Sequence, residues 1–191
     1  MNNIIKDFKT DELSNTRFVH PVKITYNLNG KDKAWEAVKS FDSVAILLYH
    51  EEKDAFLLVK QFRAPVYLND KNHLCTYELC AGIIDKKVSL EQIAKEEIDE
   101  ECGYEVNLDS IEKITSFYTN VGVSGGCQSL FFSTINESMK IHDGGGINDE
   151  QIDLMFLPLE EIEEFIYDES KAKTPGLMFA FYWFLKNKRT K

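Results

Sequence analysis

The chain lacks three features: paired cysteines, long apolar runs and an excess of basic residues. Its four cysteines form no C-x-x-C pair and accompany no histidines at zinc-ligand spacing: they are Cys75, Cys80, Cys102 and Cys127. We therefore expect reduced, packed thiols rather than disulfides or a zinc site. No stretch approaches the roughly 18 to 20 apolar residues that span a bilayer, and the start of the chain lacks the apolar core of a signal peptide. A cytoplasmic protein with no membrane partner is predicted.

Basic residues are outnumbered, with 22 lysines and arginines against 32 aspartates and glutamates, which gives a formal charge of −10. Such a surface repels a phosphate backbone, so we do not expect a nucleic acid polymer as the main partner. The 191 residues, 43% of them hydrophobic, suffice for one good core with a small appended element.

The first third of the chain is rich in strand signals. Residues 18–28 and 33–41 flank Asn29-Gly30, a strong hairpin signal. Further strands are predicted at 44–49, 55–61, 76–81, 111–118, 128–134 and 152–157, and helices at 159–167 and 175–186. The sequence therefore predicts an α/β fold in which helices pack over a mixed sheet.

One more helix starts at Leu90, with Ser89 as its N-cap and Gly103 closing its last turn. At about 100° per residue, Glu97 and Glu101 fall on the apolar side of this helix rather than on its polar back. Like charges one turn apart repel, and more strongly where they are partly desolvated. A solvated acidic face is the alternative, but its carboxylates belong on the other side. We therefore expect a divalent cation there, and oxygen ligands favour Mg²⁺ or Mn²⁺ over zinc.

Two further features carry weaker signals. Gly144-Gly145-Gly146 predicts either a mobile loop that lets an acid swing over a site when substrate is bound, or a plain surface turn. The four histidines (His20, His50, His73 and His142) share no spacing that indicates a ligand set or a relay.

The segment that contains this helix resembles the Nudix box, Gly-x5-Glu-x7-Arg-Glu-U-x-Glu-Glu-x-Gly-U, where U is apolar. Here it reads Gly82-x5-Val88-x7-Glu96-Glu97-Ile98-Asp99-Glu100-Glu101-Cys102-Gly103-Tyr104. The spacing matches throughout, but Val88 replaces the family's first glutamate and Glu96 replaces its arginine. In the family these two residues help to position the loop and the catalytic glutamates.

The resemblance continues outside the box and covers nearly the whole chain. The motifs Val59-Lys60-Gln61-Phe62-Arg63, Tyr77-Glu78-Leu79-Cys80-Ala81-Gly82, Gly122-Val123-Ser124-Gly125 and Lys173-Thr174-Pro175-Gly176 are similar to the UDP-sugar diphosphatase branch of the ADP-ribose-type Nudix hydrolases. That resemblance implies an α/β/α Nudix sandwich, a divalent metal, and a nucleoside diphosphate sugar as substrate. It also implies a homodimer in which an N-terminal β element (1–41) helps to build the partner's site, and a hydrolase domain (42–191).

Site residues follow from the same resemblance. Glu97 and Glu101 are the expected metal ligands, Glu100 a supporting or water-mediated one, and the Ala81 carbonyl another. Glu150 is the leading general base and Glu97 the second.

Three further residues have open roles. Arg63 ends a buried strand, where a guanidinium can clamp phosphate or form a structural ion pair. Glu78 can receive a ligand or pair with Arg63. Trp35 stacks on the nucleobase across the dimer by analogy, or is a cross-strand packing residue.

Two classes of function remain open. The first is an Mg²⁺-dependent diphosphatase that releases a nucleoside monophosphate and a sugar 1-phosphate, with ADP-ribose as an additional or competing substrate. The second is a catalytically weak Nudix domain that binds a nucleotide sugar as a sensor, suggested by Val88 and Glu96. The retained glutamates favour the enzyme.

Overall fold

A computed structural model describes residues 5–11, 16, 19–147 and 150–188. Its strands are β1 (His20–Leu28), β2 (Lys31–Lys39), β3 (Ser43–His50), β4 (Ala55–Gln61), β5 (Thr76–Glu78), β6 (Cys80–Ile83), β7 (Glu112–Tyr118), β8 (Cys127–Ile135), β9 (Ile152–Pro158) and β10 (Ala172–Lys173). Its helices are α1 (Ala64–Asn69), α2 (Leu90–Glu97), α3 (Ile162–Tyr167) and α4 (Pro175–Asn187), with a π-helical turn at Ile98–Cys102 and 3₁₀ turns at Leu108–Ser110, Glu137–Met139 and Leu159–Glu161.

All strands from β3 onward join one mixed sheet with the order β10-β5-β4-β3-β8-β7. The pairs β3–β8 and β10–β5 are parallel, and the other pairs are antiparallel. Strand β9 runs along β4 over its whole length. The mixed sheet predicted from the sequence is confirmed.

The sheet splits where β3 and β4 diverge. The two strands pair only at residues 48–50 and 55–57. Beyond that point β5 pairs with the C-terminal end of β4 (residues 59–61), and β6 pairs with the N-terminal end of β3 (residues 43–46). The segment 76–83 therefore crosses from one strand to the other and breaks at Leu79, so the single strand predicted at 76–81 is wrong. This crossing places Glu78, Ala81 and Gly82 at the opening of the split.

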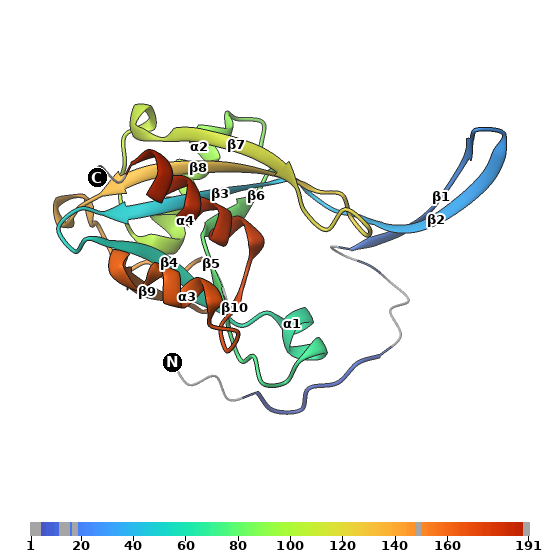
Figure 1. The fold of residues 1–191 in the computed structure, drawn as a ribbon, viewed down its shortest axis with the longest axis horizontal. Helices are drawn as coiled ribbons and strands as arrows, with labels where there is room; N and C mark the ends of the chain where they lie inside the picture. Colours follow the sequence, from blue (N-terminus) through green and yellow to red (C-terminus); the bar gives the residue numbers. More distant parts are fainter. Residues whose placement is uncertain (1–4, 12–15, 17–18, 148–149, 189–191) are drawn as a thin grey trace.

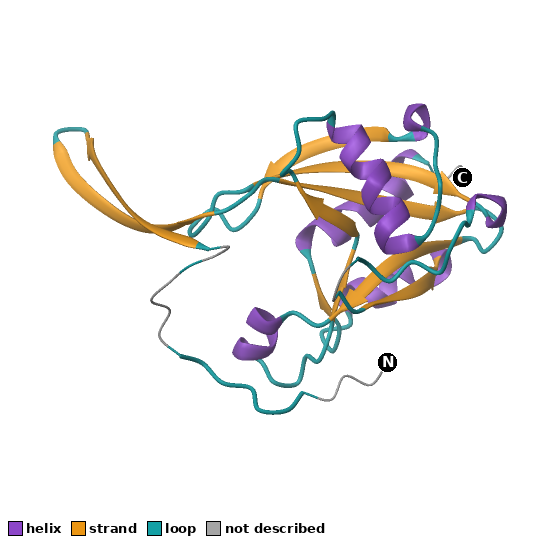
Figure 2. Ribbon diagram, turned by 180° about the vertical axis from the view of Figure 1, so that it is seen from behind, coloured by secondary structure: helices purple, strands orange, loops and turns teal. Residues whose placement is uncertain are grey.

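Helices cover both faces of the sheet. Alternate residues of β3 separate the two cores: Val44, Ile46 and Leu48 pack under α2, whereas Ala45 and Leu47 pack under α3 and α4. Helices α3 and α4 lie in front of the sheet in Figure 1, and α2 lies in front of it when the molecule is seen from behind in Figure 2. This arrangement confirms the α/β/α sandwich.

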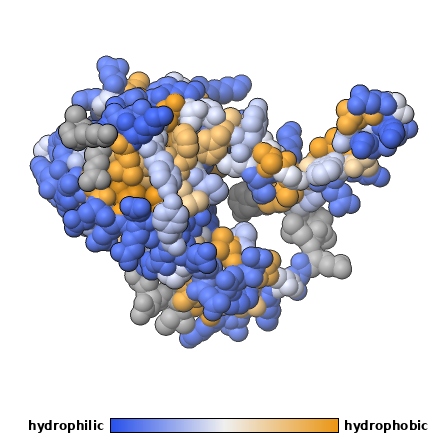
Figure 3. All heavy atoms as spheres, viewed as in Figure 1, coloured by the Kyte–Doolittle hydropathy of each residue, from blue (hydrophilic) through white to orange (hydrophobic). Residues whose placement is uncertain are grey.

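Strands β1 and β2 form a separate two-stranded sheet around Asn29-Gly30, both of which have positive φ. The predicted hairpin is confirmed, although β2 spans 31–39 rather than 33–41, and residues 17–18 lie outside the described part. Figure 1 shows the ribbon projecting away from the body of the molecule. All residues of β1 are exposed, and apolar side chains lie along the arm in Figure 3.

Two elements were not predicted. Helix α1 has only six residues and buries none of them. Such a short element shows no apolar periodicity by which a helix could be predicted. Strand β10 contains only two residues. None of the helices in the described ranges is long and apolar enough to cross a membrane.

Candidate active site

Acidic side chains converge on a cleft of about 460 Å³ at the split of the sheet. Seven of the eight residues predicted for the site line it: Arg63, Glu78, Ala81, Glu97, Glu100, Glu101 and Glu150. They come from the segment between β4 and α1, from β5, β6, α2 with its π-helical turn, and from the loop before β9. Residues separated by almost ninety positions in the sequence thus meet in one cavity.

The helix that carries three of these glutamates begins as predicted and ends differently. Ser89 Oγ accepts the Gln92 N–H at 3.1 Å, and Gly103 closes the last turn with φ 76°. Between these caps the backbone changes from α to π at Ile98, so Glu97 and Glu101 are less than one turn apart. The prediction of a regular α-helix is wrong for this last turn. Wide turns of this kind are frequent at functional sites.

Glu97 lies directly over a glycine of the crossing segment. A methyl group at Gly82 would lie 1.8 Å from Glu97 Oε1, well inside van der Waals contact. Gly82 is therefore required for the close approach of the carboxylate to the backbone of β6.

Burial perturbs two of the carboxyl groups. Glu101 is 6% exposed, and desolvation together with the charge of Glu97 raises its pKa to about 8, although the Ala81 N–H donates to its Oε2 at 2.9 Å. Desolvation and the charges of Glu100 and Glu150 raise the pKa of Glu97 to about 7. Acids with raised pKa values that share a cleft are typical of functional sites.

The donor set fits a hard divalent cation. Besides Glu78, four glutamates face the cavity, and Glu101 keeps an oxygen atom beyond the one that binds Ala81. Within the described residues, no three carboxylate oxygens from three of these glutamates lie within 4.8 Å of one another. At least one side chain must therefore rotate for three of them to bind the same ion.

Arg63 and Glu78 form a two-pronged ion pair. Arg63 Nε and Nη2 each donate to a different oxygen of Glu78 at 2.8 Å, and Thr76 Oγ1 also donates to this carboxylate. The pair confirms one of the two alternatives for Glu78. Since Nη1 of Arg63 takes no part in it and the side chain is 46% exposed at the cleft, the guanidinium keeps donors for a phosphate group.

A lysine that the sequence analysis missed also lines the cleft. Lys86 Nζ lies 2.6 Å from Glu96 Oε2, which ties the loop before α2 to the helix. Lys86 comes from the loop rather than from the helix, so helical spacing could not reveal it. Its partner Glu96 occupies the position of the family's arginine, and the ion pair supplies a link between loop and helix there.

The loop that carries Glu150 is anchored at both ends. The Gly145 and Gly146 N–H groups donate to the carbonyl oxygens of Glu101 and Glu100, at 2.8 and 3.1 Å, and the Ile152 N–H donates to the Gly145 carbonyl. Glu150 Oε2 accepts the Ile147 N–H at 3.0 Å. The glycine triplet is therefore docked on the helix end and is not the free tether that one interpretation of the sequence proposed. Residues 148 and 149 lie outside the described ranges.

Trp35 is the one predicted residue that does not line this cleft. It lies on β2 opposite Ile24, is 53% exposed, and its Nε1 donates to the Gly122 carbonyl at 3.0 Å. It is absent from the lining of the cleft of its own chain, and the hairpin that carries it projects from the body (Figure 1).

A second pocket of about 320 Å³ adjoins the cleft and shares Glu78, Ala81 and Gln128 with it. Its walls come from Leu79, the end of β7 and the start of α4, and they include no lysine or arginine. The Gln128 side chain lies at the junction and donates to Ser43 Oγ at 3.2 Å. The cleft therefore leads into a pocket suited to an uncharged group.

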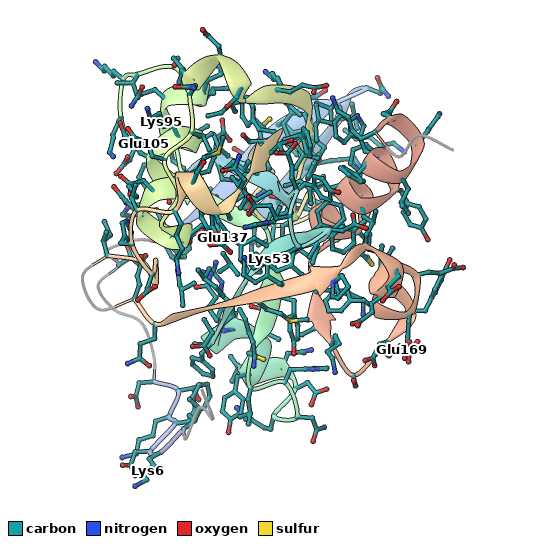
Figure 4. The ribbon with its side chains drawn as sticks, turned by 90° about the vertical axis from the view of Figure 1, so that its left-hand side faces the viewer. Lys6, Lys53, Lys95, Glu105, Glu137 and Glu169 are labelled. Atoms are coloured by element: carbon teal, nitrogen blue, oxygen red, sulfur yellow. The ribbon has the colours of Figure 1, made fainter. Side chains whose placement is uncertain are left out.

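Away from this cleft, the buried His50 lies with Glu52 and Glu137 at distances that a metal could bridge. The ammonium group of Lys53 already occupies that position: it contacts Glu137 Oε1 and lies 3.2 Å from His50 Nε2. Figure 4 shows Lys53 and Glu137 side by side. We interpret this group as an ion-pair network.

The residues that match the Nudix box thus form one unit: Glu97 lies over Gly82, and the π-helical turn that follows carries Glu100 and Glu101. A family model described as NUDIX domain matches residues 39–175. The chain belongs to the Nudix family.

Individual Nudix relatives cover most of the chain. Uridine diphosphate glucose pyrophosphatase NUDT14 of Bos taurus is 32% identical over 195 residues, which cover 87% of this chain and 88% of that protein. The protein of the same name from Mus musculus is 28% identical over the same shares. GDP-mannose pyrophosphatase of Cronobacter sakazakii is 34% identical over 146 residues, or 74% of this chain and 75% of that protein.

Proposed function

We propose that this Nudix protein hydrolyses the pyrophosphate bond of nucleoside diphosphate sugars, with UDP-glucose as the representative substrate, and requires Mg²⁺ or Mn²⁺. The observation that carries the proposal is the convergence of five glutamates and Arg63 on one cleft that opens into a pocket without basic residues. The relatives named for UDP-glucose and GDP-mannose hydrolysis support the same class of substrate.

The residues divide the work as follows. Glu97 and Glu101, supported by Glu100 and the Ala81 carbonyl, would hold the cation; when bound, it would supply positive charge against the diphosphate oxygens and acidify an attacking water. Arg63, oriented by Glu78, binds a phosphate oxygen through its remaining donors. Water attacks one phosphorus atom, the bridging P–O bond breaks, and a nucleoside monophosphate and a sugar 1-phosphate leave.

Glu150 is the proposed general base, and Glu97 is the second candidate. Glu150 is exposed at the edge of the cleft, and its charge acts on both Glu97 and Glu101. A carboxylate at this position can accept a proton from water. Glu97 is half-buried and is committed to the cation in this scheme.

We further propose a homodimer, in which the hairpin of the N-terminal β element (1–41) contacts the partner and Trp35 stacks on the partner's nucleobase. An isolated two-stranded hairpin is marginally stable in water, yet this one exposes five large apolar side chains: Val22, Ile24, Tyr26, Leu28 and Trp35. A second chain would cover them.

The deciding experiment incubates the protein with UDP-glucose, ADP-ribose and GDP-mannose, each with and without Mg²⁺, and measures the nucleoside monophosphate released. Mg²⁺-dependent release with the highest kcat/KM on a nucleotide sugar supports the proposal, whereas preference for ADP-ribose supports the alternative substrate. Tight binding without product from any of them would favour the sensor. The Lys86–Glu96 ion pair argues against the sensor, because it links loop and helix where Val88 and Glu96 depart from the family pattern.

A further inference from the structure

His142 does not line the cleft, but it links the two segments that carry the cleft glutamates, the π-helical turn and the glycine loop. Its Nε2 lies 2.8 Å from Asp99 Oδ1, and its Nδ1 lies 3.0 Å from the Gly144 nitrogen. Because a backbone N–H can only donate, Nδ1 must be the acceptor, and the remaining ring proton then lies on Nε2 and points to Asp99. One imidazole therefore holds the π-helical turn on one side and the glycine loop on the other.

Backbone contacts continue from this link toward the carboxylates. The Ile141 and His142 N–H groups both donate to the Gly103 carbonyl, and the Gly145 and Gly146 N–H groups donate to the carbonyls of Glu101 and Glu100. Steric contact is equally close, since a methyl group at Gly103 would lie 2.2 Å from the His142 carbonyl oxygen and one at Gly144 would lie 2.4 Å from that of Glu101. The loop and the helix end are packed as a single unit.

We propose that His142 is a positioning residue, which fixes the loop that carries Glu150 against the helix that carries Glu97, Glu100 and Glu101. This inference rests on the proposed function for its effect on turnover, but the link itself is a property of the protein alone. The general base must stand at a defined distance from the water that the glutamates orient, and a displacement of about 1 Å can cost on the order of a hundredfold in rate. His142 acts through Glu150 and contacts no substrate.

The test uses variants that retain one nitrogen position each. His142→Asn keeps an acceptor near the Nδ1 position, His142→Gln keeps a donor near Nε2, and His142→Ala keeps neither. Lys140→Ala is the matched control, since it removes an exposed ion pair to Asp143 in the same loop. We expect His142→Ala to lower kcat about tenfold with KM changed less than about twofold, His142→Asn and His142→Gln to lie between it and the natural protein, and Lys140→Ala to have no effect.

A readout independent of turnover is hydrogen exchange in the metal-free protein. His142→Ala should speed exchange of the Gly144, Gly145 and Gly146 amides, and Lys140→Ala should not. Unchanged exchange in His142→Ala would overturn the proposal, whatever the activity.

A double-mutant comparison tests the route through Glu150. In the Glu150→Gln background His142→Ala should cause little further loss of kcat, because the group that it positions is gone. A loss equal to that in the natural background would show that His142 acts elsewhere and would overturn the proposal. Failure of every variant and of the natural protein to hydrolyse any nucleotide sugar would refute the proposed function, and the exchange result would still decide the link.

Discussion

At the scale of single residues, the cleft depends on side chains that electrostatics disfavours. Glu101 is almost fully buried with a carboxylate neighbour, and it accepts a hydrogen bond from the Ala81 N–H. Burial of a charge without a partner is costly, so the group binds a proton unless a cation is present. The same property that destabilises the metal-free site favours the divalent ion that we propose to bind there.

Replacement of Glu101 by glutamine should lower Mg²⁺-dependent turnover by roughly two to three orders of magnitude, because the amide cannot supply the negative charge that holds the ion. Its circular dichroism spectrum should match that of the natural protein. Glu105→Gln, an exposed acid outside the cleft, is the control. Activity retained in Glu101→Gln would remove this residue from the metal site.

Gly82→Ala should also abolish metal-dependent turnover, since the new methyl group would take the place of Glu97 Oε1 and force that side chain away. Gly122→Ala is the control, because no atom lies within 4 Å of a methyl group there. The measurements are kcat and the Mg²⁺ affinity of each variant by calorimetry. Normal Mg²⁺ affinity in Gly82→Ala would show that Glu97 does not need this position.

At the scale of elements, protonation of two glutamates on α2 and its π-helical turn affects the free energy of unfolding. The pKa values of Glu97 and Glu101 are about 7 and about 8 in the folded protein, above the ordinary value of 4.5 that the unfolded chain has. Between about pH 4.5 and pH 8 the folded state therefore binds more protons than the unfolded state. The free energy of unfolding of the metal-free protein therefore decreases as the pH rises from about 4.5 to about 8.

Urea denaturation in EDTA at several pH values across that range should show this decrease, and Glu101→Gln should show a smaller one. Added Mg²⁺ should stabilise the protein more at high pH than at low pH, because the glutamates must lose their protons to bind it. Stability that is independent of pH, or Mg²⁺ stabilisation that weakens as the pH rises, would contradict the assignment.

At the scale of the whole molecule, the hairpin is the part that the single chain leaves incomplete. Ile24 and Trp35 face each other across the two strands, and both are exposed. The body has two filled cores, one on each side of the sheet, whereas the arm has none. The exposed apolar face of the arm is the surface at which we propose contact with a second copy.

Ile24→Glu should shift the protein from dimer to monomer in light scattering, because a buried charge at the partner contact lacks compensation. Thr25→Glu changes the opposite face of the same strand and should leave the dimer intact. The monomer should also show a raised KM for the nucleotide sugar if Trp35 contacts the partner's substrate. A natural protein that is monomeric at all concentrations would refute the dimer.

The sequence by itself determined what local physics encodes. The Asn29-Gly30 turn, the apolar runs of β3 and β4, and the Ser89 and Gly103 caps each specify their own neighbourhood through backbone preference and alternation. The acids of the helix could be identified as site residues because their placement contradicted the amphipathic pattern. The spacing of the Nudix-box residues indicated the family.

Only the tertiary structure decided how these pieces meet. The break at Leu79, the approach of Lys86 to Glu96, and the link from His142 to Asp99 join segments up to 43 residues apart, and no local pattern records such contacts. They arise because the sheet splits and the helix widens, and both are compromises among many packing contacts. The sequence determines the chemistry of each residue, whereas the packing of the whole molecule sets the distances between the residues of the site.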